Sequence, residues 1–122
     1  MSFIPAVQRE MNSRQPNDPV RLTLEHLSRR AVGHQHPVTL ADMVAHLRTQ
    51  GINLSVKQFQ QSVLAISRDA DFFIGSGNRG IYLIDTIDDA RVMRDFYVAR
   101  IQAEQQNLDN LQRKAVQVGW NL

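Results

Sequence analysis

The 122-residue sequence contains no cysteine, which excludes disulfide bonds and thiolate chemistry of the catalytic, redox or metal-binding kind. It also lacks any run of about 18 apolar residues, the length that a membrane-spanning helix requires. The first fifteen residues have neither the cationic start nor the apolar stretch of a secretory signal peptide. We therefore expect a cytoplasmic protein without a membrane partner.

Catalytic motifs are missing as well. No serine occupies a nucleophile elbow, no H-E-x-x-H segment is present, and the carboxylates form no recognisable catalytic pair. His34, His36 and His46 are candidate metal ligands, but two of them fall in a predicted loop and no thiolate supports them. We expect no enzyme activity, no cofactor and no metal site.

Charge is modest and unevenly placed. The net charge is +2, yet residues 1–84 carry nine Lys or Arg against six Asp or Glu, whereas residues 85–122 carry five against six. A positive surplus in the first part of the chain permits contact with phosphate groups without requiring it.

The length and the apolar content of 43% fit one compact domain with an appendage. Residues 17–85 are predicted to form the domain and residues 86–120 a long helix. Residues 1–16 mix apolar and basic side chains, so that a short helix and a mobile arm both remain open.

Three helices are predicted inside the domain. Asp18 and Pro19 are typical of a helix start, and the apolar spacing that follows continues to a stop at Gly33. Thr39 begins a second helix that ends at Gly51, and residues 37–38 before it can supply a short strand. A capping box at residues 55–58 opens a third helix, which we expect to reach residue 68.

A β-hairpin follows the third helix. Residues 72–74 and 81–84 are β-branched or aromatic, and the glycine-rich residues 75–80 between them suit a turn. The same residues match the G-x-G-x-x-G fingerprint of dinucleotide sites. That fingerprint works only where a helix follows, and here a strand is predicted, so the glycines are interpreted as turn residues.

The C-terminal helix carries an apolar heptad pattern. Its first half is expected to close the domain core with Val92, Met93, Phe96 and Tyr97. Alternating steps of three and four define a set that we call the heptad stripe: Ile87, Ala90, Arg94, Tyr97, Ile101, Glu104, Leu108, Leu111, Ala115 and Val118. An isolated amphipathic helix needs a second apolar surface, and a second copy of the chain would supply it. The expected dimer interface is Tyr97, Ile101, Leu108, Leu111, Ala115 and Val118. In the alternative, the stripe folds back onto residues 3–7.

The segments 39–47, 55–66 and 77–83 carry a resemblance to the prokaryotic winged helix-turn-helix superfamily, over residues 18–84. The resemblance implies an α+β, mostly α-helical fold with a two-stranded wing. The long helix after the wing is similar to that of PadR-like and replication-terminator-like regulators, which pair through a C-terminal helix.

The resemblance also implies that the third helix enters the major groove of DNA and that the wing contacts the backbone or the minor groove. The DNA-binding residues implied in this sequence are Ser55, Lys57, Gln58, Gln61, Ser62, Arg68, Asn78 and Arg79. Glutamine can pair with adenine and lysine with guanine, although a merely solvated polar face is an alternative.

These observations together predict a homodimeric protein that binds double-stranded DNA with sequence specificity, as a small transcriptional regulator does. The alternative is a winged-helix module that binds another protein through its long helix and the region of Leu64, without binding DNA.

Overall fold

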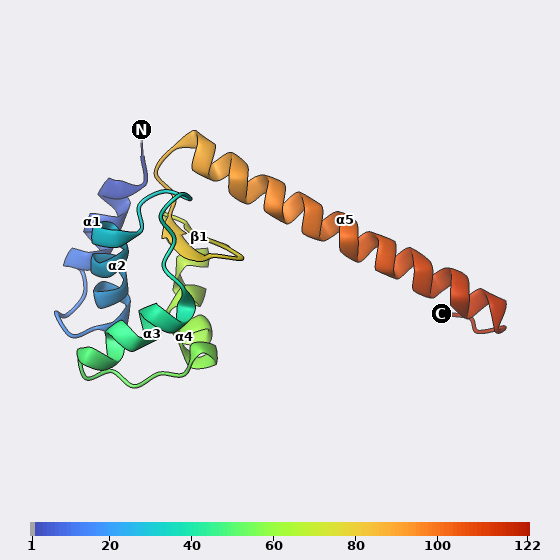
Figure 1. Cartoon of the computed structure of the whole chain (residues 1–122), viewed down its shortest axis with the longest axis horizontal. Helices are drawn as coiled ribbons and strands as arrows, with labels where there is room; N and C mark the ends of the chain where they lie inside the picture. Colours follow the sequence, from blue (N-terminus) through green and yellow to red (C-terminus); the bar gives the residue numbers. More distant parts are fainter. Residues whose placement is uncertain (1) are drawn as a thin grey trace.

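The computed structural model describes residues 2–122, apart from the side chains of residues 67 and 68. Over this part of the chain the fold is α+β and mostly helical (Figure 1). The elements in chain order are α1 (Ile4–Asn12), α2 (Pro19–Arg30), α3 (Leu40–Thr49), α4 (Val56–Ser62), the 3₁₀ helix η1 (Leu64–Arg68), β1 (Ile74–Gly77), β2 (Gly80–Leu83) and α5 (Ile87–Gln117). Helices followed by a hairpin and a long helix are compatible with a winged helix-turn-helix.

The N-terminal segment forms a helix of the domain itself. α1 packs against α2, and its Val7 is fully buried in the shared core. Arg14 lies in the connection and forms ion pairs with Glu10 behind it and Asp18 ahead of it. The open question about residues 1–16 is thus answered in favour of a short helix over most of their length.

The two following helices begin where the sequence indicates. The Asp18 side chain accepts a hydrogen bond from the Val20 backbone N–H at 2.8 Å, and Thr39 accepts one from Asp42 at 3.1 Å, so each caps its helix. Gly51, with φ of +85°, follows α3 as a helix-ending glycine should.

The predicted stop of α2 at Gly33 is wrong. The helix ends at Arg30, and Val32 forms a parallel bridge with Leu83 of β2. The chain leaves the helix early because this pairing attaches the end of α2 to the hairpin. A contact across more than fifty residues is not readable from helical periodicity.

The hairpin is antiparallel, with Ile74 opposite Leu83 and Gly77 opposite Gly80. Val38 forms an isolated antiparallel bridge with Ile81 on the other side of β2, so the short strand predicted at residues 37–38 is reduced to a single bridging residue. At Gly80 φ is +131°, and a Cβ atom there would lie 2.2 Å from the Val38 carbonyl oxygen. Only glycine fits this position, because β2 passes so close to the preceding loop.

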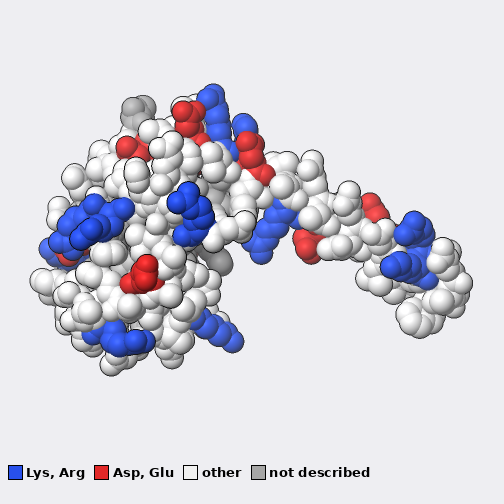
Figure 2. Space-filling model, viewed as in Figure 1, with Lys and Arg blue, Asp and Glu red and all other residues white. Residues whose placement is uncertain are grey.

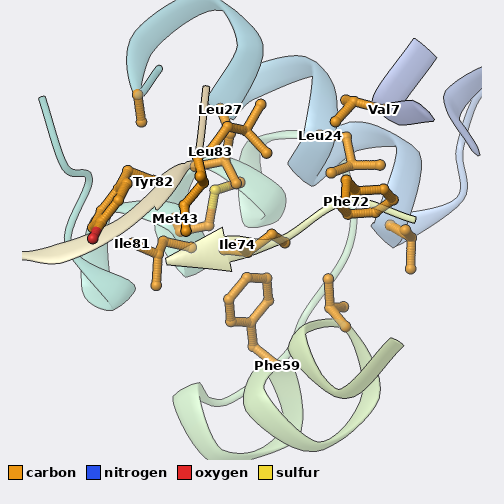
Figure 3. Close-up of a cluster of buried hydrophobic side chains, with 14 of the residues drawn as sticks. Val7, Leu24, Leu27, Met43, Phe59, Phe72, Ile74, Ile81, Tyr82 and Leu83 are labelled. Carbon is orange, nitrogen blue, oxygen red and sulfur yellow. The ribbon is translucent and has the colours of Figure 1, made fainter. Parts of the chain in front are cut away.

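The core lies between the helices and the inner face of the hairpin. Figure 3 shows Phe59 of α4 directed at Ile74 of β1, with Leu24 and Leu27 of α2 on the opposite side of the strand. Phe59, Leu24 and Leu27 have no exposed surface. Burial of this kind stabilises by about 1.5–3 kcal/mol per large apolar side chain, and it anchors α4 through one face.

The long helix α5 leaves the domain soon after it begins. Its capping box is formed by Thr86 and Asp89. Met93 is buried against the hairpin, but Val92, Phe96 and Tyr97 are exposed, so the prediction that all four close the core is wrong. Only the face of α5 that carries Met93 contacts the domain, because the domain is too small to surround the helix.

The remainder of α5 projects away from the domain (Figure 1). Its 31 residues extend about 46 Å at about 1.5 Å per residue. Leu108 and Leu111 are exposed rather than folded back onto residues 3–7. No helix within residues 2–122 has both the length and the apolar character needed to cross a membrane.

Candidate nucleic-acid interface

Helix α4 presents a polar face to solvent. Phe59 on its inner side is fully buried, while Lys57 and Gln61 are exposed and form no hydrogen bond or ion pair with the described part of the chain. Both side chains are therefore available to an external partner. Val56, which the apolar spacing assigns to the core, is exposed instead, because it is the first residue of the helix and lies at the domain edge.

Three of the expected contact residues are engaged in holding the helix itself. Gln58 N–H donates to Ser55 Oγ at 3.1 Å, and Ser55 N–H donates to Gln58 Oε1 at 2.9 Å. Ser62 Oγ donates to the Gln58 carbonyl at 2.6 Å. A bidentate pair with adenine needs the amide oxygen of glutamine, which in Gln58 is already an acceptor within the capping box.

The third helix is shorter than predicted. α4 ends at Ser62, and the chain continues as the 3₁₀ helix η1 rather than as an α-helix to residue 68. The tighter turn packs Leu64 and Ile66 against the core, whereas a continuous α-helix would direct Leu64 outward. Arg68 is an expected contact residue, but its side chain lies outside the described residues.

The tip of the hairpin is a two-residue turn made of Asn78 and Arg79. Both residues are exposed, and Arg79 has no hydrogen-bond or ion-pair partner in the chain as described. Neither has a positive φ; among the turn residues only Gly80 does. Figure 1 shows the tip projecting from the helices on the side toward which α5 also extends.

Positive charge does not form one continuous stripe on the face seen in Figure 2. Lys and Arg occur there in separate groups, with acidic side chains between some of them. The uncompensated cations on α4 and at the hairpin tip are single residues, Lys57 and Arg79. Such an arrangement supplies point contacts with phosphate rather than a strong overall field.

A buried carboxylate, unrelated to the expected contacts, fixes the start of α5. Asp89 is 3% exposed and accepts backbone hydrogen bonds from His34 at 3.0 Å, Asp85 at 3.0 Å and Thr86 at 3.1 Å, and its Oδ1 contacts His34 Nδ1. Burial alone would raise the pKa of Asp89, but the hydrogen bonds outweigh it and hold the pKa well below its usual range.

Asp89 belongs to the capping box of α5, but its contact with His34 was not indicated by the sequence. The two residues are 55 positions apart, and no local pattern links them. Their contact joins the loop after α2 to the first turn of α5. Together with Met93, which is buried beside the hairpin, this contact holds the start of α5.

Two other histidines form a stacked pair. The rings of His26 on α2 and His46 on α3 have centroids 3.9 Å apart. Burial lowers the pKa of His26, and the nearby charges of His46, Arg29 and Arg30 lower it further. Within residues 2–122, no group of three or more His, Asp or Glu side chains is arranged to hold a metal ion.

The exposed apolar side chains gather on α5. Those of the heptad stripe that are exposed are Ile87, Tyr97, Ile101, Leu108, Leu111 and Val118. Ala115 differs, because it is buried within its own chain. A helix that exposes this many apolar groups suggests self-association.

The chain matches no protein-family model, no curated protein and no solved structure.

Proposed function

We propose that the protein binds double-stranded DNA with sequence specificity as a homodimer, in the manner of a small transcriptional regulator. One observation carries the proposal. A short helix is anchored through a single buried aromatic, Phe59, and leaves Lys57 and Gln61 unpaired on its outer face.

The proposal assigns different roles to the expected contact residues. Gln61 has a free amide and would read an adenine edge in the major groove, while Lys57 would contact guanine or phosphate. Asn78 and Arg79 at the hairpin tip would meet the backbone or the minor groove. Arg68 remains a proposed DNA contact.

The remaining members of the set would act indirectly. Gln58 is hydrogen-bonded to both Ser55 and Ser62, so the role of these residues would be to stabilise α4. Their replacement would weaken DNA binding through loss of the helix rather than through loss of a base contact.

Pairing through α5 would place two reading helices on one duplex. Two-fold related readers of this kind engage half-sites about one helical turn apart. Exposed Leu108 and Leu111 support the pairing, because each would otherwise remain in water.

A gel-shift titration against random genomic fragments at two salt concentrations tests DNA binding. We expect a retained subset of fragments and weaker retention at higher salt, because phosphate contacts release counterions. Lys57→Ala, Gln61→Ala and Arg79→Ala should each weaken retention. Arg91→Ala is the matched control, since it removes a positive charge from exposed α5. If all three variants retain fragments as well as the wild type does, the face assigned to DNA binding is wrong.

Sedimentation tests the pairing separately. Replacement of Leu108 and Leu111 by Asp should yield monomers, because charges would enter an apolar interface. An unchanged mass would reject this interface.

A protein-interaction module remains the second candidate. The exposed apolar face of α5 favours it, but Leu64, its other proposed contact, is partly buried against the core. Failure to retain any fragment at either salt concentration would favour this candidate over DNA binding.

A further inference from the structure

Three hollows follow one another along α5 and share lining residues. The first, of about 310 Å³, is lined by Ser2, Phe3, Asp85, Thr86, Ile87 and Ala90. The second, of about 400 Å³, is almost wholly apolar and is lined in part by Phe3, Phe73, Met93 and Tyr97. The third, of about 450 Å³, runs from Tyr97 to Leu108. Together they mark one continuous surface, which we call the α5 surface, from Phe3 just before α1 to the middle of α5.

The residues of the heptad stripe line this surface. Ile87 and Ala90 line the first hollow, Tyr97 lines the second and third, and Leu108 closes the third. The stripe is defined by heptad spacing in the sequence, whereas the hollows are defined by the shape of the surface, so the two criteria are independent. Their coincidence identifies one face of α5 as the face that a partner helix would cover.

The far end of α5 holds an exposed aromatic in a defined position. The backbone N–H of Trp120 donates to the Ala115 carbonyl at 2.9 Å, and that of Gly119, with φ of +81°, donates to Val116 at 3.1 Å. This pair of bonds is a Schellman motif, which folds the chain back over the last turn. Ala115 is consequently buried, while Trp120 remains 67% exposed beside it.

We infer that two copies of the chain pair their α5 helices antiparallel in a single register, with residues 112–122 of each copy covering the first hollow of the other. The inference deepens the proposed function and rests on the homodimer. It commits the α5 surface to one occupant, a second copy of this chain.

Charge complementarity selects the register. The heptad stripe contains two polar residues, Arg94 and Glu104, of opposite sign. In an antiparallel pair with Arg94 facing the partner's Glu104, the ion pair forms twice by symmetry, and each of the four charged side chains has one opposite charge. The other layers are then apolar throughout: Tyr97 with Ile101, Ala90 with Leu108, and Ile87 with Leu111.

In neighbouring registers Arg94 and Glu104 do not face opposite charges. Sliding by one heptad in one direction places Arg94 against Leu111, and sliding in the other places it against Tyr97. In both cases Glu104 also faces an apolar side chain. A parallel pair sets Arg94 against Arg94 and Glu104 against Glu104. Each alternative desolvates Glu104 without an opposite charge and leaves Arg94 with only Asp95 of its own chain, which is costly.

The selected register leaves a definite overhang. Residues 87–111 of one copy lie alongside residues 87–111 of the other, over about 37 Å at about 1.5 Å per residue. Residues 112–122 then extend past the partner's Ile87, toward the hollow lined by Phe3 and Thr86. Trp120 is the exposed aromatic of that segment, so it would be covered by the partner's domain.

Charge exchange tests the register. Arg94→Glu and Glu104→Arg should each raise the dimer dissociation constant about tenfold or more, and the double exchange should restore it to within about threefold. Sedimentation over a range of protein concentrations measures the dissociation constants of the single and the double variants. Failure of the double exchange to restore association would overturn the register, because rescue occurs only where the two positions meet.

Fluorescence tests the overhang directly, because Trp120 is the single tryptophan of the chain. We expect the dimer to emit at shorter wavelength and to resist acrylamide quenching, relative to the Leu108→Asp/Leu111→Asp variant as the exposed reference. Phe3→Asp should restore quenching of Trp120, whereas Gln8→Asp, at an exposed position of α1 outside the hollow, should not.

The outcomes separate this inference from the proposed function. A dimer whose Trp120 is quenched as fully as in the reference variant would overturn the overhang and leave the homodimer standing. A monomeric wild-type chain would overturn both, while fragment retention would still report on DNA binding.

Discussion

Replacement of Asp89 tests whether one buried carboxylate attaches the long helix to the domain. In Asp89→Ala the backbone N–H groups of His34, Asp85 and Thr86 lose their acceptor. Loss of a hydrogen bond to a charged group costs about 1.5–3 kcal/mol. Because water can reach part of the three donors, we expect a total loss of about 3 kcal/mol.

Thermal unfolding followed by circular dichroism measures this loss. For a chain of this length, about 3 kcal/mol corresponds to a fall in Tm of about 10 °C. Asp89→Asn keeps one acceptor oxygen and should lose about half as much. Asp88→Ala is the matched control, because Asp88 is in the same helical turn but is exposed. All samples need the same protein concentration, since self-association contributes to Tm.

The difference between wild type and Asp89→Asn should also depend on pH. The folded pKa of Asp89 is depressed, so its carboxylate contributes its full stabilisation above the ordinary aspartate pKa of about 3.9. That contribution is lost as pH falls through the lower folded pKa. The gap in Tm should therefore be widest near pH 7 and narrow below about pH 4. A Tm of Asp89→Ala equal to that of Asp88→Ala at pH 7 would refute the reasoning.

Three further substitutions test the local structure around the candidate interface. Gly80→Ala should cost about 2 kcal/mol or more, because the new Cβ would meet the Val38 carbonyl at a positive φ; a variant as stable as wild type in denaturant titration would contradict the close approach. Gln58→Ala should cost about 1 kcal/mol by removing half of the capping box with Ser55, while Gln58→Glu retains it; equal midpoints for the two variants would argue against the box. Val7→Ala should cost about 2 kcal/mol by leaving a cavity between α1 and α2, and a loss below about 0.5 kcal/mol in the same titration would show that α1 is not packed there.

Local signals predicted the starts of the helices well. Asp18, Thr39, Ser55 and Thr86 all cap helices in the structure, because a side-chain oxygen near a free backbone N–H acts over a few residues. The hairpin followed from β-branched runs and turn residues in the same way. The candidate contacts Lys57, Gln61 and Arg79 were identifiable as well, as polar residues opposite a buried stripe or at a turn.

Features that depend on distant segments were not readable in this way. α2 ends early because Val32 pairs with Leu83, and α4 gives way to a 3₁₀ turn because Leu64 packs against the core. The exposure of Phe96 depends on how little of α5 the domain can cover.

The sequence by itself determined the order of helices, the hairpin and the heptad stripe, because capping, turn geometry and apolar periodicity act between residues close along the chain. Only the tertiary structure decided that Gln58 is occupied within its own capping box while Gln61 remains free. It alone revealed that His34 holds Asp89, since the two meet only after the chain has folded. Hydrogen bonding between groups 55 residues apart depends on their positions in space, and neither spacing nor composition records those positions.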